Sequence, residues 1–134
     1  MKNLDNNQIF EQAAEKAQAH SPFLARLLSL YPDVLSGLCE SGADAVYSDL
    51  FARLSELENN EMEQTALMRE LRLAKGKLAL FTALADIAEV WSLEKVTAAL
   101  SDFAQKCLVI TVNHLLFSAK KRDDISSVEV HSSG

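Results

Sequence analysis

The chain has 134 residues, of which 49% are hydrophobic, and its formal net charge is −6. This length suits one ordinary domain with a real core and leaves little room for a second one. The acidic balance argues against non-specific binding to nucleic acid or to an anionic membrane surface.

Four short helices are predicted in the first part of the chain from the spacing of its apolar residues. The first covers about residues 7–19. Ser21 and Pro22 fit the N-cap and the first position of the second helix, because the Ser hydroxyl accepts from a free N–H and Pro has no N–H to lose. Pro32 begins the third helix, which runs to about residue 41, and the fourth spans about residues 44–58.

Two long helices follow and are predicted to pair. Over about residues 62–90 the apolar positions alternate in steps of four and three, which is typical of a helix packed along another helix. Ser92 fits the N-cap of the next helix, over about residues 92–120. The short link between them predicts antiparallel neighbours. The expected seams are Leu67, Leu71, Ala74, Leu78, Phe81, Ala85 and Ala88 in the first helix and Leu93, Val96, Leu100, Phe103, Cys107, Ile110 and Leu115 in the second.

The pattern therefore predicts an all-α, multi-helix bundle in which a long antiparallel helical hairpin follows shorter N-terminal helices. Residues 1–121 form the expected single domain, and the polar residues 122–134 lose the periodicity and are expected to form a tail. The longest apolar run, residues 108–119, is shorter than the ~20 residues that cross a bilayer. With no secretory signal at the start, we expect no membrane association and a cytoplasmic location.

The sequence has few residues in patterns that suit metal binding or nucleophilic catalysis. His20, His114 and His131 are scattered, and no Glu-x-x-His pair of a di-iron bundle occurs. The acidic run between residues 56 and 63 is expected to be a solvated helix end. Cys107 and His114 lie about two turns apart, roughly 10 Å by helical rise, which is too far for a thiolate–imidazolium pair. No Gly-rich phosphate loop occurs. We therefore expect no catalytic residue, no metal and no bound cofactor in this chain.

The cations Arg69, Arg72 and Lys75 are spaced by three residues and are expected to share one helix edge. They could face phosphates or an acidic partner, although residue chemistry alone favours pairing with acids such as Glu70. Asp86 has apolar neighbours and is expected either on a narrow polar edge or beside a cation, in a structural role. Trp91 and Phe103 are likewise expected to have a structural role, as anchors of the core around the hairpin turn.

One long stretch resembles a known family. "LRLAKGKLALFTALADIAEVWSLEKVTAALSDFAQ", residues 71–105, resembles the helical region at the start of the glutamine synthetase adenylyltransferase family, the enzymes that add AMP to glutamate–ammonia ligase and remove it. The likeness rests on Arg72 and Lys75 and on residues 83–86, 93–97 and 100–104. The segment "SPFLARLLSLYP", residues 21–32, is similar to the N-terminal Ser-Pro-Phe segment of the family.

The resemblance implies that a nucleotidyltransferase fold with an Asp-x-Asp pair for magnesium follows this region in the family. Here Asp123 and Asp124 are adjacent and have polar neighbours, so they do not offer two carboxylates on one side of a strand. The chain is thus expected to be either a truncated gene product or a fragment of a larger enzyme, inactive alone. ATP and magnesium are implied for the full-length family, and glutamine synthetase and PII-type regulators are implied partners.

Two functions are compatible with these observations. The chain is either the helical lead-in to the adenylyl-removing half of such an enzyme or a stand-alone helical interaction module. In either case, if the last helix has no neighbour on its outer side, that side would form a sizeable apolar patch. We then expect the chain to self-associate.

Overall fold

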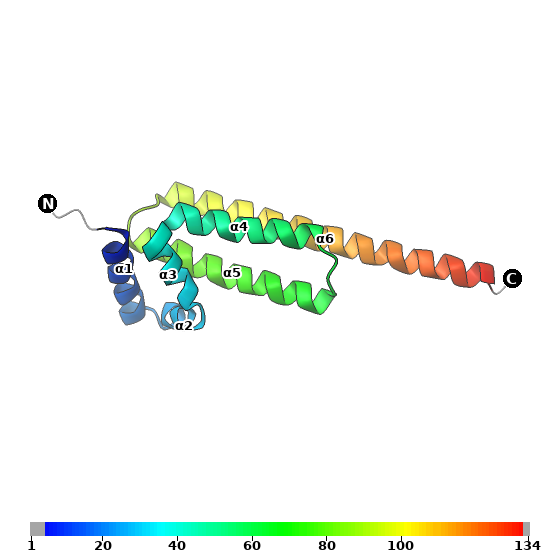
Figure 1. Ribbon diagram of the computed structural model, residues 1–134, viewed down its shortest axis with the longest axis horizontal. Coiled ribbons are helices and arrows are strands. Elements are labelled where there is room, and N and C mark those ends of the chain that lie inside the picture. Colours follow the sequence, from blue (N-terminus) through cyan, green and yellow to red (C-terminus); the bar gives the residue numbers. More distant parts are fainter. Residues whose placement is uncertain (1–4, 133–134) are drawn as a thin grey trace.

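The computed structural model describes the backbone of residues 5–132 and the side chains of residues 5–123. Six α-helices and no strand occur in this part of the chain (Figure 1), which confirms the predicted all-α bundle. The helices are α1 (Asn6–His20), α2 (Pro22–Leu30), α3 (Pro32–Ser41), α4 (Ala43–Asn59), α5 (Gln64–Ile87) and α6 (Leu93–Ser132). None of the described helices is both long enough and apolar enough to cross a membrane.

Local capping interactions define the short helices. The Asp5 carboxylate accepts from the Gln8 N–H, and the Gln8 side chain accepts in return from the Asp5 N–H, so that a capping box opens α1. As predicted, the Ser21 hydroxyl accepts from the Leu24 N–H and Pro22 is the first residue of α2. Gly42 separates α3 from α4 with φ of 88°, a region that glycine adopts at little cost.

Helices α4, α5 and α6 contact one another and form a three-helix bundle. In Figure 1 the chain runs from left to right along α4, back along α5, and from left to right again along α6, so α5 is antiparallel to both of the others. The predicted α5–α6 hairpin is therefore confirmed, and α4 is its third member. Contacts along the length keep α4 and α6 in register: the Tyr47 hydroxyl donates to the Ala99 carbonyl, and Lys106 pairs with Glu58.

The three short helices gather at the end of the bundle where α5 ends and α6 begins (Figure 1). Helix α1 packs against α2, α3 and α5, and its Phe10 is among the most buried side chains. The Tyr31 ring, at the corner between α2 and α3, lies on Gly76 of α5, where an added Cβ would come within 2.6 Å of the Tyr31 hydroxyl. A glycine in mid-helix thus lets the ring approach the α5 backbone.

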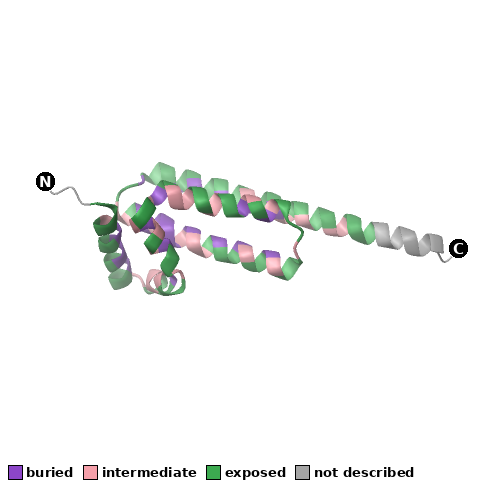
Figure 2. Ribbon diagram, in the orientation of Figure 1, coloured by how far each residue is buried: buried purple, intermediate pink, exposed green. Residues whose placement is uncertain are grey.

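A continuous core runs between the bundle helices, visible as the facing purple segments in Figure 2. Its largest fully buried side chains include Phe10, Phe81 and Phe103. Tyr47, Phe81 and Trp91 form an aromatic cluster near the α5–α6 turn, with centroid distances of 5.2–5.9 Å and edge-to-face or tilted rings.

The turn between α5 and α6 has a defined geometry. The Val90 N–H donates to the Ala85 carbonyl and the Glu89 N–H to the Asp86 carbonyl, which are the two bonds of a Schellman motif. Glu89 occupies its left-handed position with φ of 59°, where glycine is usual. Helix α5 therefore ends at Ile87, three residues before the predicted residue 90. Ser92 caps α6 as predicted, because its hydroxyl accepts from the Lys95 N–H.

Two expectations for α6 were wrong. The seam includes Ala99, whereas three predicted seam residues are exposed, by 72%, 42% and 49%: Leu93, Leu100 and Leu115. Because α6 has apolar residues on two sides, spacing alone did not identify the side that meets α5. The helix also continues past residue 120, and its backbone is helical to Ser132, since neither Gly nor Pro interrupts residues 93–132. The division into a domain at residues 1–121 and a tail at 122–134 stays a prediction, and the tail side chains after residue 123 lie outside the described residues.

Candidate functional site

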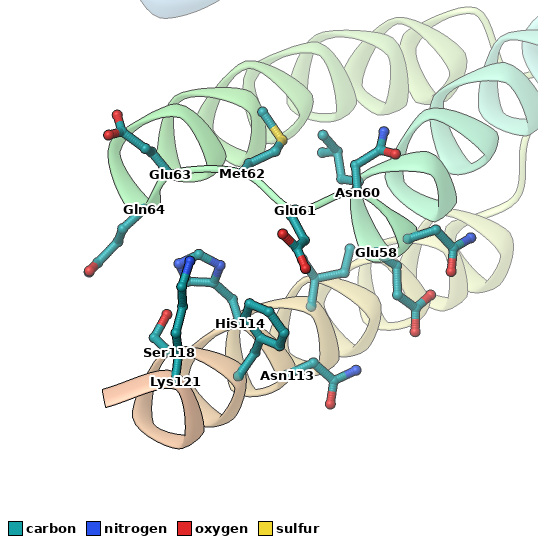
Figure 3. A pocket seen from close by; sticks show the side chains of 14 residues that line it. Glu58, Asn60, Glu61, Met62, Glu63, Gln64, Asn113, His114, Ser118 and Lys121 are labelled. Carbon is teal, nitrogen blue, oxygen red and sulfur yellow. The ribbon is translucent and has the colours of Figure 1, made fainter. Parts of the chain in front are cut away.

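A cavity with a volume of about 520 Å³ lies at the end of the bundle, between the α4–α5 turn and α6 (Figure 3). Glu61 and Met62 line it from the turn, and His114 and Lys121 line it from α6. In Figure 3 the side chains of His114 and Lys121 rise from α6 toward the turn, while Glu61 reaches toward α6. The arrangement exists because α6 extends beyond the point at which α4 ends and α5 begins.

The cavity is large enough for a small ligand, and its side chains are suited to binding and not to catalysis. Its volume falls within the range typical of small-molecule sites. Acidic side chains line the turn, and one imidazole and one ammonium group line the helix, over apolar residues such as Ile110 and Phe117. No described hydrogen bond orients His114 toward a nucleophile. Nothing here forms the nucleophile, base and orienting group of a covalent catalyst.

The predicted basic edge is exposed on α5. Arg69, Arg72 and Lys75 all point to solvent, and none of them forms an ion pair within the described residues. Glu70, the acid expected to pair with them, instead lies 3.4 Å from Arg53 of α4. Arg69 and Arg72 line the same shallow depression, of about 380 Å³.

Lys75 is separated from the other two cations. It does not line their depression, and its charge acts on the thiol of Cys107 in α6. A three-residue step turns a helix by about 300°, so two such steps rotate Lys75 by roughly 120° from Arg69. The structure therefore brings the two arginines together and places the lysine nearer to α6.

The residues predicted to be structural occupy three different settings. Trp91 and Phe103 are buried, with 6% and 1% of their surface exposed. Asp86 is exposed and forms no ion pair within the described part of the chain, while its carbonyl accepts in the Schellman turn.

Asp44 is the polar partner of Trp91, and sequence reasoning did not identify it. The Trp91 indole N–H donates to the Asp44 carboxylate at 2.9 Å, and Lys95 binds the same oxygen at 2.8 Å. The Lys95 ammonium also lies 4.9 Å from the centre of the Trp91 ring. The hydrogen bonds from Lys95 and Trp91 lower the pKa of Asp44 below its ordinary value. No sequence signal joins residues so far apart along the chain.

The thiols are not activated nucleophiles. Burial raises the pKa of Cys107, and the nearby Lys75 charge offsets this only in part. Burial, together with nearby acids such as Glu11, also raises the pKa of Cys39. Among residues 5–123, no three His, Cys, Asp or Glu side chains are grouped so that they could hold a metal ion.

Comparison with known proteins places these features in a family context. A family model described as glutamate-ammonia ligase adenylyltransferase matches residues 11–129. A bifunctional glutamine synthetase adenylyltransferase/adenylyl-removing enzyme of Rhodopseudomonas palustris is 34% identical over 96 residues, which are 72% of this chain and 10% of that protein.

Relatives with the same description give similar values. The one from Bradyrhizobium diazoefficiens is 34% identical over 96 residues, and the one from Brucella suis is 31% identical over 103 residues, 74% of this chain. The chain spans about a tenth of the length of these relatives. No solved structure gives a significant match.

Proposed function

The chain belongs to the glutamate-ammonia ligase adenylyltransferase family, and we propose that it forms the N-terminal helical region of a bifunctional glutamine synthetase adenylyltransferase/adenylyl-removing enzyme. The observation that carries the proposal is the extent of the family match, which runs from α1 through the bundle into the projecting part of α6. In this role the chain takes part in the reversible transfer of AMP to glutamine synthetase, in the bacterial cytoplasm.

The proposed contribution is structural. Phosphoryl-transfer sites depend on metal ions and on groups that position the phosphates. The described residues do not fit a magnesium site, because their carboxylates are not grouped for a metal. We therefore assign ATP and magnesium to other parts of the family's longer proteins, and we expect the chain alone to be inactive.

We propose that the basic edge contacts another component of the reaction. Arg69 and Arg72 are exposed, adjacent and without an ion pair in the described part of the chain, so their charge is available to phosphate or to an acidic protein surface. We propose that they face either the nucleotide or glutamine synthetase. Lys75, which points nearer to α6, is a secondary member of this edge, and PII-type proteins are the proposed regulators.

A second candidate is a stand-alone helical interaction module. It is favoured by one specific observation: the side of α6 that faces away from the bundle carries exposed Leu and Val residues. Such a face is suited to packing against another helix.

The first test of the proposed function measures AMP release from adenylylated glutamine synthetase by the purified chain with phosphate and magnesium. We expect no turnover, and measurable turnover would overturn the assignment of catalysis to other parts of the family's proteins.

The second test replaces the segment of the Bradyrhizobium diazoefficiens enzyme that aligns with this chain by the 96 matching residues of this chain. The chimera should retain transfer and removal of AMP, and a folded chimera without either activity would contradict the proposed function. Arg69→Glu combined with Arg72→Glu should lower the activity at least about tenfold, since each interfacial charge contributes to binding. The matched control is Lys16→Glu with Arg26→Glu, two exposed cations on α1 and α2, which should leave the activity unchanged.

A further inference from the structure

Helix α6 has apolar residues on two opposite sides. One side faces α4 and α5 and is buried. The other side carries five exposed branched residues, with 39–63% of their surface accessible. At 100° per residue the two sets point in opposite directions. The buried set is Val96, Ala99, Phe103, Cys107 and Ile110, and the exposed set, called here the outer face, is Leu108, Val109, Val112, Leu115 and Leu116.

The outer face is continuous and lies where α6 passes the end of the bundle. Its residues follow the i, i+4, i+7 spacing of a helix-packing stripe. Five such residues present a contiguous apolar patch of roughly a few hundred Å², which is about the size of the largest patch on a typical monomer, and such a patch is often functional. Figure 2 shows this part of α6 as largely exposed.

We propose that the outer face pairs with the outer face of a second copy of this chain, with the two α6 helices antiparallel. The pattern of the stripe supports a two-fold axis at Val112. About this axis Leu108 lies opposite Leu116 of the second copy, and Val109 lies opposite Leu115. A self-complementary arrangement of this kind is what a two-fold symmetric interface requires.

Charges beside the stripe agree with the antiparallel direction. Asp102 and Lys120 are exposed, lie on the same flank of the stripe and form no ion pair within the described residues. They are placed almost equally far before and after Val112, so an antiparallel pair brings Lys120 of each copy close to Asp102 of the other. In a parallel pair the same two levels would be roughly 27 Å apart along the axis.

The pairing is also sterically open. The bundle of each copy lies on the buried side of its own α6, so the two bundles would lie on opposite sides of the helix pair. The interface is modest in area, and we therefore expect a dimer with micromolar affinity, as for small interfaces in general. This inference goes beyond the proposed function and does not rest on it, since it requires no AMP transfer.

The test is sedimentation velocity of the full chain from low to high micromolar concentration. The wild-type mass should rise from one copy to two. Val112→Glu should lower the association constant at least about 100-fold, because it places a charge at the centre of the interface. The matched control is Leu100→Glu, on the same helix but off the stripe, since Leu100 and Val112 are 42% and 43% exposed. This control should still dimerise.

A charge exchange tests the register. Lys120→Glu or Asp102→Lys alone should each weaken the dimer about tenfold, and the double variant should restore it. A monomer at every concentration, or a dimer that Val112→Glu does not weaken, would overturn the proposal. Single charge variants without any effect would overturn the antiparallel register. These outcomes are independent of the AMP-transfer assays, so failure here and failure of the proposed function are distinguishable.

Discussion

Gly76 provides a quantitative test of how the short helices are attached to the bundle. In an exposed helix interior, Gly→Ala stabilises a protein by about 0.5–1 kcal/mol, because Gly loses more backbone freedom on folding. Here the added methyl would lie 2.6 Å from the Tyr31 hydroxyl oxygen and 2.8 Å from a ring carbon. Tyr31 is the C-cap of α2 and directly precedes Pro32, which restricts its backbone, so the ring can move away only by rotation of its own side chain.

We therefore expect Gly76→Ala to lower the free energy of unfolding of the wild type by about 1–2 kcal/mol, since overpacking costs about 1–3 kcal/mol and exceeds the helical gain. In a Tyr31→Ala background the clash is absent, and the same substitution should stabilise the protein by about 0.5–1 kcal/mol. The coupling between the two positions should then be about 1.5–3 kcal/mol.

Urea unfolding followed by far-ultraviolet circular dichroism measures all four members of this cycle. Ala83→Gly, about two turns further along α5, calibrates the intrinsic helical cost and should have the same effect in both backgrounds. If Gly76→Ala stabilised the wild type and the Tyr31→Ala variant equally, the reasoning that the ring rests on α5 would be refuted.

Two further predictions concern the α5–α6 turn. Glu89→Gly should raise the free energy of unfolding by about 0.5–1 kcal/mol, because it removes left-handed strain at φ of 59°; thermal melting measures the effect, and Glu89→Ala, which keeps the strain, should not reproduce it. Asp44 has a lowered pKa in the folded chain. Its bonds to Trp91 and Lys95 therefore stabilise the fold above the ordinary Asp pKa of about 3.9. This stabilisation is lost as the pH falls through the lower pKa of the folded state. Unfolding followed by the fluorescence of Trp91, the single tryptophan, should show an advantage of wild type over Asp44→Asn at neutral pH that disappears in acid, and an equal advantage at all pH values would contradict this account.

Much of the fold could be predicted because it is encoded locally. Ser21, Pro22 and Ser92 have cap positions that follow from their own backbone and hydroxyl chemistry. The steps of four and three in α5 identify the side that meets its neighbours, and all its predicted seam residues up to Ala85 are buried.

The remaining features depend on residues far apart in the chain. Leu100 and Ala99 are adjacent, and only the position of α4 and α5 decides that Ala99 is buried. Glu89 ends α5 without the glycine that would have indicated a Schellman turn. The contact of Asp44 with Trp91 and Lys95 joins α4 to the α5–α6 turn and to α6, which meet only in the folded chain.

The same holds for the candidate site. The exposure of Arg69 and Arg72 could be anticipated, but that neither forms an ion pair among the described side chains depends on Arg53 reaching Glu70 from another helix. The turn of Lys75 away from them follows from helical geometry and was missed by counting spacing alone.

The uninterrupted backbone of α6 has a mechanical consequence. At 1.5 Å per residue its 40 residues extend roughly 60 Å, against roughly 36 Å for the 24 residues of α5. The bundle holds α6 as far as Ile110, so the 22 residues from there to Ser132 form an arm of roughly 33 Å, and a tilt of about 10° at its base would displace the far end by roughly 6 Å. Small repacking around Ile110, where α6 leaves the bundle, would in this way be amplified at Ser132.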